Sequence, residues 1–337
     1  MSSLEQGALN AFPESRIDAE YFALRNGAGI SPLDDRLLIR VVGSDRVAFM
    51  HGMCSQDVKS LATGAVAPAL ILNERAHVIA DLFLYVEPDA LLIEIDRRLW
   101  PAARDHLERL LVADDVEFET LDAMAMLDLE GPLSGQAAAA IAGPRVADLA
   151  EWRHVTADGL TIANLPRYGT QAYSIIASRT IIDDLAAKIM GAADRPEAAR
   201  VAPETLEIIR VENGHARVGI DTNEKTIALE ARLELAISFS KGCYVGQETI
   251  ERATARGGIR KKLFGLRIAG PRTPAPGAAV IYQEKEAGRL TSVVRSPRFG
   301  VIGLAIIHQQ AWTPGATVAV HADNGEFSGV VSELPFQ

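Results

Sequence analysis

Residues 238–248 read SFSKGCYVGQE and concentrate reactive side chains in a run punctuated by two glycines. The run carries a thiol, an ammonium group, a carboxylate, an amide and a phenol, which belong to Cys243, Lys241, Glu248, Gln247 and Tyr244. Because glycine has no Cβ, Gly242 and Gly246 are predicted to provide left-handed or closely approached backbone on either side of the thiol. This combination is typical of a functional site.

A helix is predicted directly after the thiol. It covers residues 247–256, because Gly257 and Gly258 follow, and glycine is common just beyond a helix end. Cys243 then lies ahead of a helix N-terminus and beside Lys241, and both features favour a thiolate. Three interpretations of Cys243 stay open: a nucleophile, although the sequence shows no histidine partner; a redox-active or cluster-contacting thiol; and a packed structural thiol.

Cations gather at the end of this predicted helix. Glu248 and Arg252 are four residues apart with the acid first, which favours an ion pair on one helix face. Further cations follow within a short distance, namely Arg256, Arg260, Lys261 and Lys262. They form either a solvated face or a site for an anion.

The octapeptide KGCYVGQE, residues 241–248, resembles the signature of the YgfZ/GcvT-like folate-binding family. This family includes bacterial YgfZ and mitochondrial iron–sulfur assembly factors, and it is related to the aminomethyltransferase of glycine cleavage. The segments RVENG (210–214) and IRVVGSDRVAFMHGMCSQD (39–57) resemble the same family. The resemblance extends from about Arg36 to the end of the chain.

The resemblance implies a protein that binds tetrahydrofolate, with or without a polyglutamate tail, and assists the assembly, insertion or repair of [4Fe–4S] clusters. Its expected partners are iron–sulfur assembly proteins or [4Fe–4S] client enzymes. Folate is expected in a hollow between three domains, with Cys243 facing that hollow. The residues implied in folate binding are Asp81, Arg210, Glu212, Tyr244, Gln247, Glu248 and Arg252, and cations near Arg252 would meet the anionic tail.

Two departures argue against ordinary aminomethyl transfer. The transferases carry an acidic pair before an apolar strand, whereas the chain has Ala80 and Asp81 there. The middle-domain segment that is rich in glycine and glutamate corresponds to residues 167–173, which contain no glutamate. Because a lost acid or base costs on the order of 100-fold in rate, such chemistry is disfavoured. Whether the chain is an enzyme stays open, with a folate-dependent transferase or demethylase and a non-catalytic scaffold as alternatives.

Composition sets further limits. The chain has 337 residues and a formal net charge of −10, so we expect two or three domains and no coating of nucleic acid. No apolar run is long enough to span a bilayer and the N-terminal segment is acidic, which predicts a cytoplasmic protein. Two cysteines cannot hold an iron–sulfur cluster by themselves, and the histidines lack zinc-site spacing. We therefore expect no permanently bound metal.

The apolar pattern predicts an α+β protein. Two ferredoxin-like α/β sandwich units, residues 30–120 and 121–261, are expected to precede a small antiparallel β-barrel over residues 262–337. The 241–248 motif is assigned to the second unit, although the chain can interleave the two. Residues 191–202 are predicted to be a surface connector, and Cys54 is predicted to be a buried structural thiol.

Overall fold

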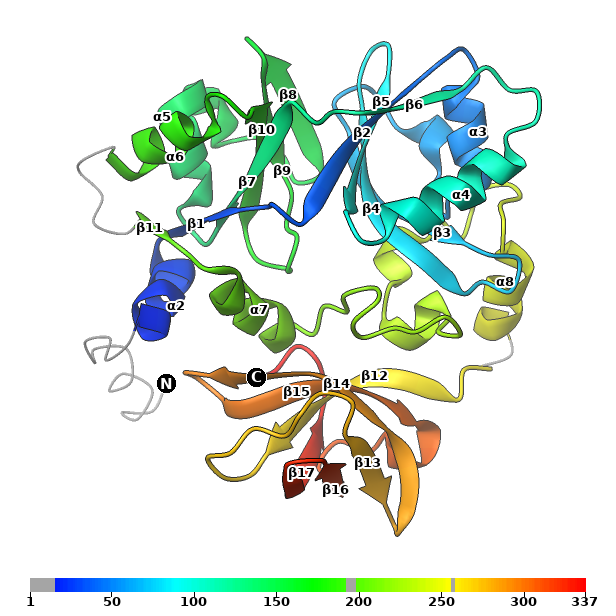
Figure 1. The fold of residues 1–337 in the computed structure, drawn as a ribbon, viewed down its shortest axis with the longest axis vertical. Helices are drawn as coiled ribbons and strands as arrows, with labels where there is room; N and C mark the ends of the chain where they lie inside the picture. Colours follow the sequence, from blue (N-terminus) through cyan, green and yellow to red (C-terminus); the bar gives the residue numbers. More distant parts are fainter. Residues whose placement is uncertain (1–15, 192–197, 256–257) are drawn as a thin grey trace.

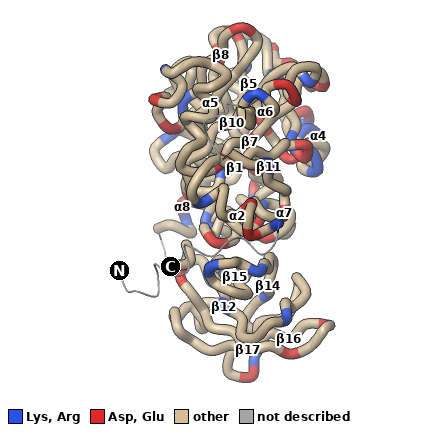
Figure 2. The backbone as a smooth tube through the Cα atoms, turned by 90° about the vertical axis from the view of Figure 1, so that its left-hand side faces the viewer, with Lys and Arg blue, Asp and Glu red and all other residues tan. Residues whose placement is uncertain are grey.

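The structure, a computed structural model, describes residues 16–191, 198–255 and 258–337. Two β-sheets lie side by side with helices on their outer flanks, and a barrel lies below them (Figure 1). A view from the side shows the barrel as a separate lower lobe, with helices α2 (Arg16–Asn26) and α7 (Pro203–Glu212) at the waist (Figure 2). The predicted fold class, two α/β units and a barrel, is confirmed.

The first sheet is antiparallel and has the strand order β3-β4-β5-β2-β6. Its strands are β2 (Arg36–Val42), β3 (Val66–Leu72), β4 (Val78–Val86), β5 (Leu91–Asp96) and β6 (Glu117–Thr120). Helices α3 (Arg46–Met53) and α4 (Trp100–Leu110) cover its outer face, and the 3₁₀ helix η1 (Val58–Ser60) follows α3.

The second sheet has the order β11-β1-β7-β10-β9-β8. Its strands are β1 (Ala28–Pro32), β7 (Met124–Glu130), β8 (Arg153–Ala157), β9 (Leu160–Asn164), β10 (Ala172–Ser178) and β11 (Ala198–Arg200), and its helices are α5 (Ser134–Ala142), η2 (Pro144–Val146) and α6 (Ile182–Gly191). Strand β11 pairs in parallel with β1, so this part of the predicted connector is a strand. Residues 192–197 of that connector lie outside the described residues.

The chain interleaves the two units, so neither unit is one continuous stretch of sequence as the expected boundaries had it. Strand β1 precedes the first sheet in sequence but pairs with β7 of the second. Residues from Val218 to Ile250 pack on the first sheet and share an apolar cluster with Leu70, Leu72 and Val78. This segment contains η3 (Ala228–Ala231), η4 (Glu234–Ala236) and α8 (Gln247–Ala255). The 241–248 motif, expected in the second unit, therefore lies against the first.

The barrel is closed by six antiparallel strands in the order β12-β15-β14-β13-β16-β17. They are β12 (Lys261–Ile268), β13 (Ala279–Tyr282), β14 (Lys285–Ser296), β15 (Gly300–His308), β16 (Thr317–Ala322) and β17 (Gly325–Ser332), with η5 (Gln309–Ala311) after β15. In the described ranges, no helix is long and apolar enough to cross a membrane.

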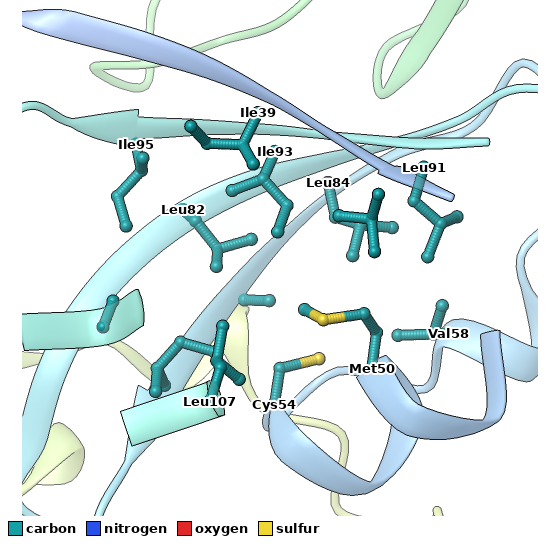
Figure 3. Close-up of a cluster of buried hydrophobic side chains, with 14 of the residues drawn as sticks. Ile39, Met50, Cys54, Val58, Leu82, Leu84, Leu91, Ile93, Ile95 and Leu107 are labelled. Atoms are coloured by element: carbon teal, nitrogen blue, oxygen red, sulfur yellow. The ribbon is translucent and has the colours of Figure 1, made fainter. Parts of the chain in front are cut away.

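Successive side chains along the strands of the first sheet point to its two faces, as a period of two residues requires. The outer face carries an apolar cluster under α3 and α4 that includes Leu82, Leu84, Ile93 and Ile95 (Figure 3). Cys54 is fully buried in the same cluster, which confirms the prediction of a buried thiol.

The inner face of the first sheet packs on the second sheet through an apolar cluster that includes Leu38, Leu92 and Leu165, and it also carries buried polar groups. Its central group is Glu94, which is fully buried and accepts hydrogen bonds from Arg167 Nη1 at 2.6 Å, Arg36 Nε at 2.9 Å and the Tyr85 hydroxyl at 2.9 Å. Burial by itself would keep the Glu94 carboxyl protonated, but Arg167 and Arg36 outweigh it and lower its pKa to about 2. Arg167 belongs to the second unit, so this ion pair joins the two sheets.

The two motif glycines are predicted to respond differently to alanine. Gly246 has φ +87°, and a Cβ there would lie 2.7 Å from the Asn73 carbonyl oxygen, so Gly246→Ala should destabilise the fold by about 2 kcal/mol. Gly242 lacks a left-handed φ and no described atom lies within 4 Å of its Cβ position, unlike the sequence expectation. Gly242→Ala should therefore change stability by less than about 0.5 kcal/mol in denaturant unfolding. Equal losses would contradict this account.

The Glu94 ion pair predicts a pH-dependent stability. The folded-state pKa of about 2 lies below the ordinary 4.5, so the contribution is complete above about pH 4.5 and disappears as the pH falls through 2. Glu94→Gln should lower the free energy of unfolding by on the order of 3 kcal/mol near pH 7. In urea unfolding series, this difference should shrink below pH 4.5.

The exposed Glu248 is the control for that series. It pairs with Arg252 on the surface of α8, so Glu248→Gln should produce little change at any pH. A Glu94→Gln difference that stays constant down to pH 2 would show that the ion pair is not its cause.

Candidate functional site

A cavity of about 180 Å³ lies where the two sheets meet the end of α7 and the segment 232–236. Its wall combines residues of both units that are far apart in sequence, including Asp81, Phe83, Trp152, Arg167 and Arg217. The cavity lies beside the apolar cluster that joins the two sheets, and Phe83 and Trp152 both pack against that cluster and line the cavity.

The inner wall is built from flat groups. The rings of Phe83 and Trp152 lie 6.3 Å apart and are tilted by 33°. The guanidinium groups of Arg167 and Arg36 lie 5.0 Å and 5.8 Å from the centre of the Phe83 ring. Such a wall offers stacking and cation–π contacts to a planar ligand.

Asp81 places a carboxylate on this wall. It stands two residues before Phe83 on β4, so both side chains lie on the same face of the sheet. Burial raises the pKa of Asp81, while the charge of Arg36 acts in the opposite direction. A half-buried carboxyl with a raised pKa can act as an acid or base. The structure therefore gives the predicted Asp81 a position from which it can contact a ligand.

Cations surround the more exposed side of the cavity. Arg217 is 36% exposed and pairs with Asp35 and with Asp96 at 3.3 Å. Arg232 lies 3.1 Å from Glu333, and Leu235 beside it is 66% exposed. This side, the mouth of the cavity, can bind an anionic group that extends out of it.

Arg210 and Glu212 mainly join α7 to its neighbours. Arg210 lines the cavity, but its guanidinium binds Glu207 at 2.6 Å, Asp221 at 2.7 Å and Ser292 at 2.6 Å. Glu212 is buried and accepts hydrogen bonds from Tyr21 at 2.9 Å, from Arg25 and from Ser296 on the barrel. It is absent from the cavity wall in the described part of the chain. Their predicted folate contacts stay untested.

Lys241 is buried and its ammonium binds the end of α3. It donates to the carbonyl oxygens of His51, Cys54 at 2.8 Å and Gln56 at 2.9 Å, at the end of α3. Helix ends leave carbonyl oxygens without partners, so a buried cation there satisfies them. Burial lowers the pKa of Lys241, and its Nζ lies 4.8 Å from the Tyr244 ring centre.

This anchoring leaves the Cys243 thiol exposed on the outer surface. No residue of 238–248, a run that the structure describes completely, lines the central cavity. The expectation that Cys243 faces the hollow is thus corrected. The Lys241 side chain fixes the loop on the end of α3, and α3 packs on the outer face of the first sheet.

The other motif residues also lie outside the cavity. Tyr244 is buried in the apolar cluster around Leu70, and Gln247 donates to Glu251 at 2.6 Å. Glu248 and Arg252 form the predicted ion pair on α8, with both side chains exposed. Arg256 lies outside the described residues. The described cations of this region, Arg252, Arg260, Lys261 and Lys262, therefore do not line the cavity.

Several cavity residues were not singled out from the sequence, above all Trp152, Arg217 and Arg232. One signal was available in the sequence. Glu94 and Asp96 interrupt the apolar strand LLIEID at alternate positions, which predicts polar side chains on one face of the sheet. The described ranges contain no group of three histidine, cysteine or acidic side chains that could hold a metal ion.

Comparison with known proteins gives the same picture of the fold. A chloroplastic protein of Arabidopsis thaliana, provisionally named as a transferase, is 27% identical over 98% of this chain and 76% of its own length. The aminomethyltransferase of Lysinibacillus sphaericus is 24% identical over 96% of this chain and 90% of its own. The structure of the glycine cleavage system aminomethyltransferase T from Bartonella henselae superposes with a TM-score of 0.86, at 21% identity, over 99% of this chain and 96% of that one.

Two family models divide the chain between them. Residues 9–241 match the GCVT N-terminal domain, and residues 261–337 match the glycine cleavage T-protein C-terminal barrel domain. The first model covers both sheets and the second covers the closed barrel. The chain therefore belongs to the GCVT family, with the N-terminal domain and the C-terminal barrel of the glycine cleavage T-protein.

Proposed function

We propose that the chain binds tetrahydrofolate, or a derivative of it, in the central cavity. The observation that carries this proposal is the wall of Phe83, Trp152 and Asp81, which offers a flat surface and a carboxyl group to a pterin ring. Relatives named as aminomethyltransferases support it.

The size of the cavity suggests how folate would lie. Its volume of about 180 Å³ is below the roughly 300–1,000 Å³ of pockets for whole ligands, so it suits the ring system alone. The glutamate tail, with or without further glutamates, would then extend through the mouth beside Arg217 and Arg232. In this proposal, Arg217 and Arg232 take the place of Arg252 and its neighbours as the expected contacts of the glutamate tail.

We further propose that the folate-bound protein assists the assembly, insertion or repair of [4Fe–4S] clusters in the cytoplasm. The exposed Cys243 supports this role, because a thiol held on the surface by the buried Lys241 can contact an assembly protein or a client enzyme. Two cysteines in the chain make storage of a cluster implausible, so the role would be assistance.

A folate-dependent transferase or demethylase is the second candidate. The specific observation in its favour is Asp81, the acid retained in the cavity with a raised pKa. Formation of methylene-tetrahydrofolate from an aminomethyl donor, with release of ammonia, would establish a transferase activity. A scaffold without folate is a third possibility, which a lack of tetrahydrofolate binding in calorimetry would support.

Folate binding is predicted to depend on the cavity and not on α8. In calorimetric titrations with tetrahydrofolate, Phe83→Ala should weaken binding about tenfold, because a stacking surface is lost. Arg252→Ala, the matched surface change, should leave the affinity unchanged. If Arg252→Ala weakens binding and Phe83→Ala does not, the cavity is the wrong site.

The iron–sulfur role is predicted to require the exposed thiol in addition to bound folate, so loss of the thiol should abolish the role without weakening folate binding. In a strain that lacks the gene, wild-type protein should restore the activity of [4Fe–4S] enzymes, whereas Cys243→Ser should not, although it still binds tetrahydrofolate. Gly242→Ala, an adjacent change with open space around it, is the control and should restore activity. Full rescue by Cys243→Ser would exclude a role for this thiol.

A further inference from the structure

Arg167 is the guanidinium held deepest in the cavity wall. Its side chain is 5% exposed, against 36% for Arg217 at the mouth. Nη1 donates to Glu94 at 2.6 Å and Nη2 donates to Ser174 Oγ at 2.9 Å, while the group lies over Phe83. Residues of β5, β10 and β4 therefore fix its position before any ligand arrives.

These contacts leave donor capacity on Arg167. All five N–H bonds of a guanidinium can donate, and each of the two hydrogen bonds uses one of them. The Nε atom lies 3.5 Å from Asp128 and has no hydrogen-bond partner among the described residues. Because Nε is buried against Asp128, the donors that Arg167 can offer to a ligand in the cavity it lines are the second N–H groups of Nη1 and Nη2.

Three buried carboxyl groups, those of Glu94, Asp128 and Glu130, lie near the guanidinium group of Arg167. Glu94 is ionised, since its pKa is about 2. Burial raises the pKa of Asp128 and, with the adjacent Asp128 charge, raises that of Glu130 well above its ordinary value. Of these three carboxyl groups, only Glu94 accepts a hydrogen bond from Arg167 among the described residues.

We propose that Arg167 selects the head group of the folate ligand by donating a hydrogen bond to the carbonyl oxygen of its pterin ring. The cavity then accepts 4-oxo-pteridines and rejects 4-amino-pteridines, which place a donor at the same position on a more basic ring. This inference rests on the proposed folate function. If the Asp81 carboxylate selected the head group instead, the order of affinities would be reversed.

The test compares two ligands that carry different groups, oxo or amino, at ring position 4. Tetrahydrofolate and 4-amino-4-deoxytetrahydrofolate are titrated into the full-length protein by calorimetry. Wild-type protein should bind tetrahydrofolate roughly 10- to 100-fold more tightly, as expected for one hydrogen bond from a charged donor. Arg167→Met should reduce this ratio to below about threefold, whereas Arg217→Met, which removes a cation at the mouth, should weaken both ligands and preserve the ratio.

Equal or tighter binding of the 4-amino compound to the wild-type protein overturns the inference, and this result needs no variant. If Arg167→Met fails to fold, Arg167→Lys serves in its place and should lower the ratio, because lysine lacks the planar donor arrangement. Absence of binding for both ligands would refute the proposed folate function, and the inference with it. Binding of tetrahydrofolate with a ratio near one refutes the inference alone.

Discussion

The ion pair between Arg167 and Glu94 is the constraint on which the central architecture depends. It crosses from one sheet to the other at 2.6 Å with both side chains buried, beside an apolar cluster in which Leu92 of the first sheet packs with Leu165 and its neighbours in the second. A buried charge without its partner is costly, and the pair therefore fixes the relative position of the sheets. The opposite face of the first sheet carries another apolar cluster beneath α3 and α4, part of which Figure 3 shows.

The cavity is a consequence of this arrangement. Phe83 and Trp152 pack against the apolar cluster between the two sheets and line the cavity at its edge. Arg210 closes the structure from below, because it ties α7 to Asp221 and to Ser292 of the barrel. The two sheets and the segment from Arg210 to Ala236 thus surround one small space with aromatic, cationic and acidic groups, which is the chemistry that a pterin ring with an anionic tail requires.

Much of the fold could be predicted from local patterns. The apolar pattern and the regular turns predicted two α/β units followed by an antiparallel barrel, because each such pattern is set by a few neighbouring residues. The cavity could not be identified in this way. Trp152 and Arg217 join it only through contacts between distant segments, and Lys241 beside Cys243 gives no indication that its ammonium binds the end of α3. The loop that carries Cys243 therefore lies on the outer surface, whereas strand residues such as Asp81 and Arg36 line the cavity.

The account separates two places, an interior cavity for folate and an exterior thiol for a partner. A crystal structure of the protein with tetrahydrofolate bound tests this separation most directly. The account predicts the pterin ring against Phe83 and Trp152, with its carbonyl oxygen toward Arg167 and its glutamate toward Arg217 and Arg232. Folate bound beside Cys243 on the outer surface, with the cavity empty, would contradict it.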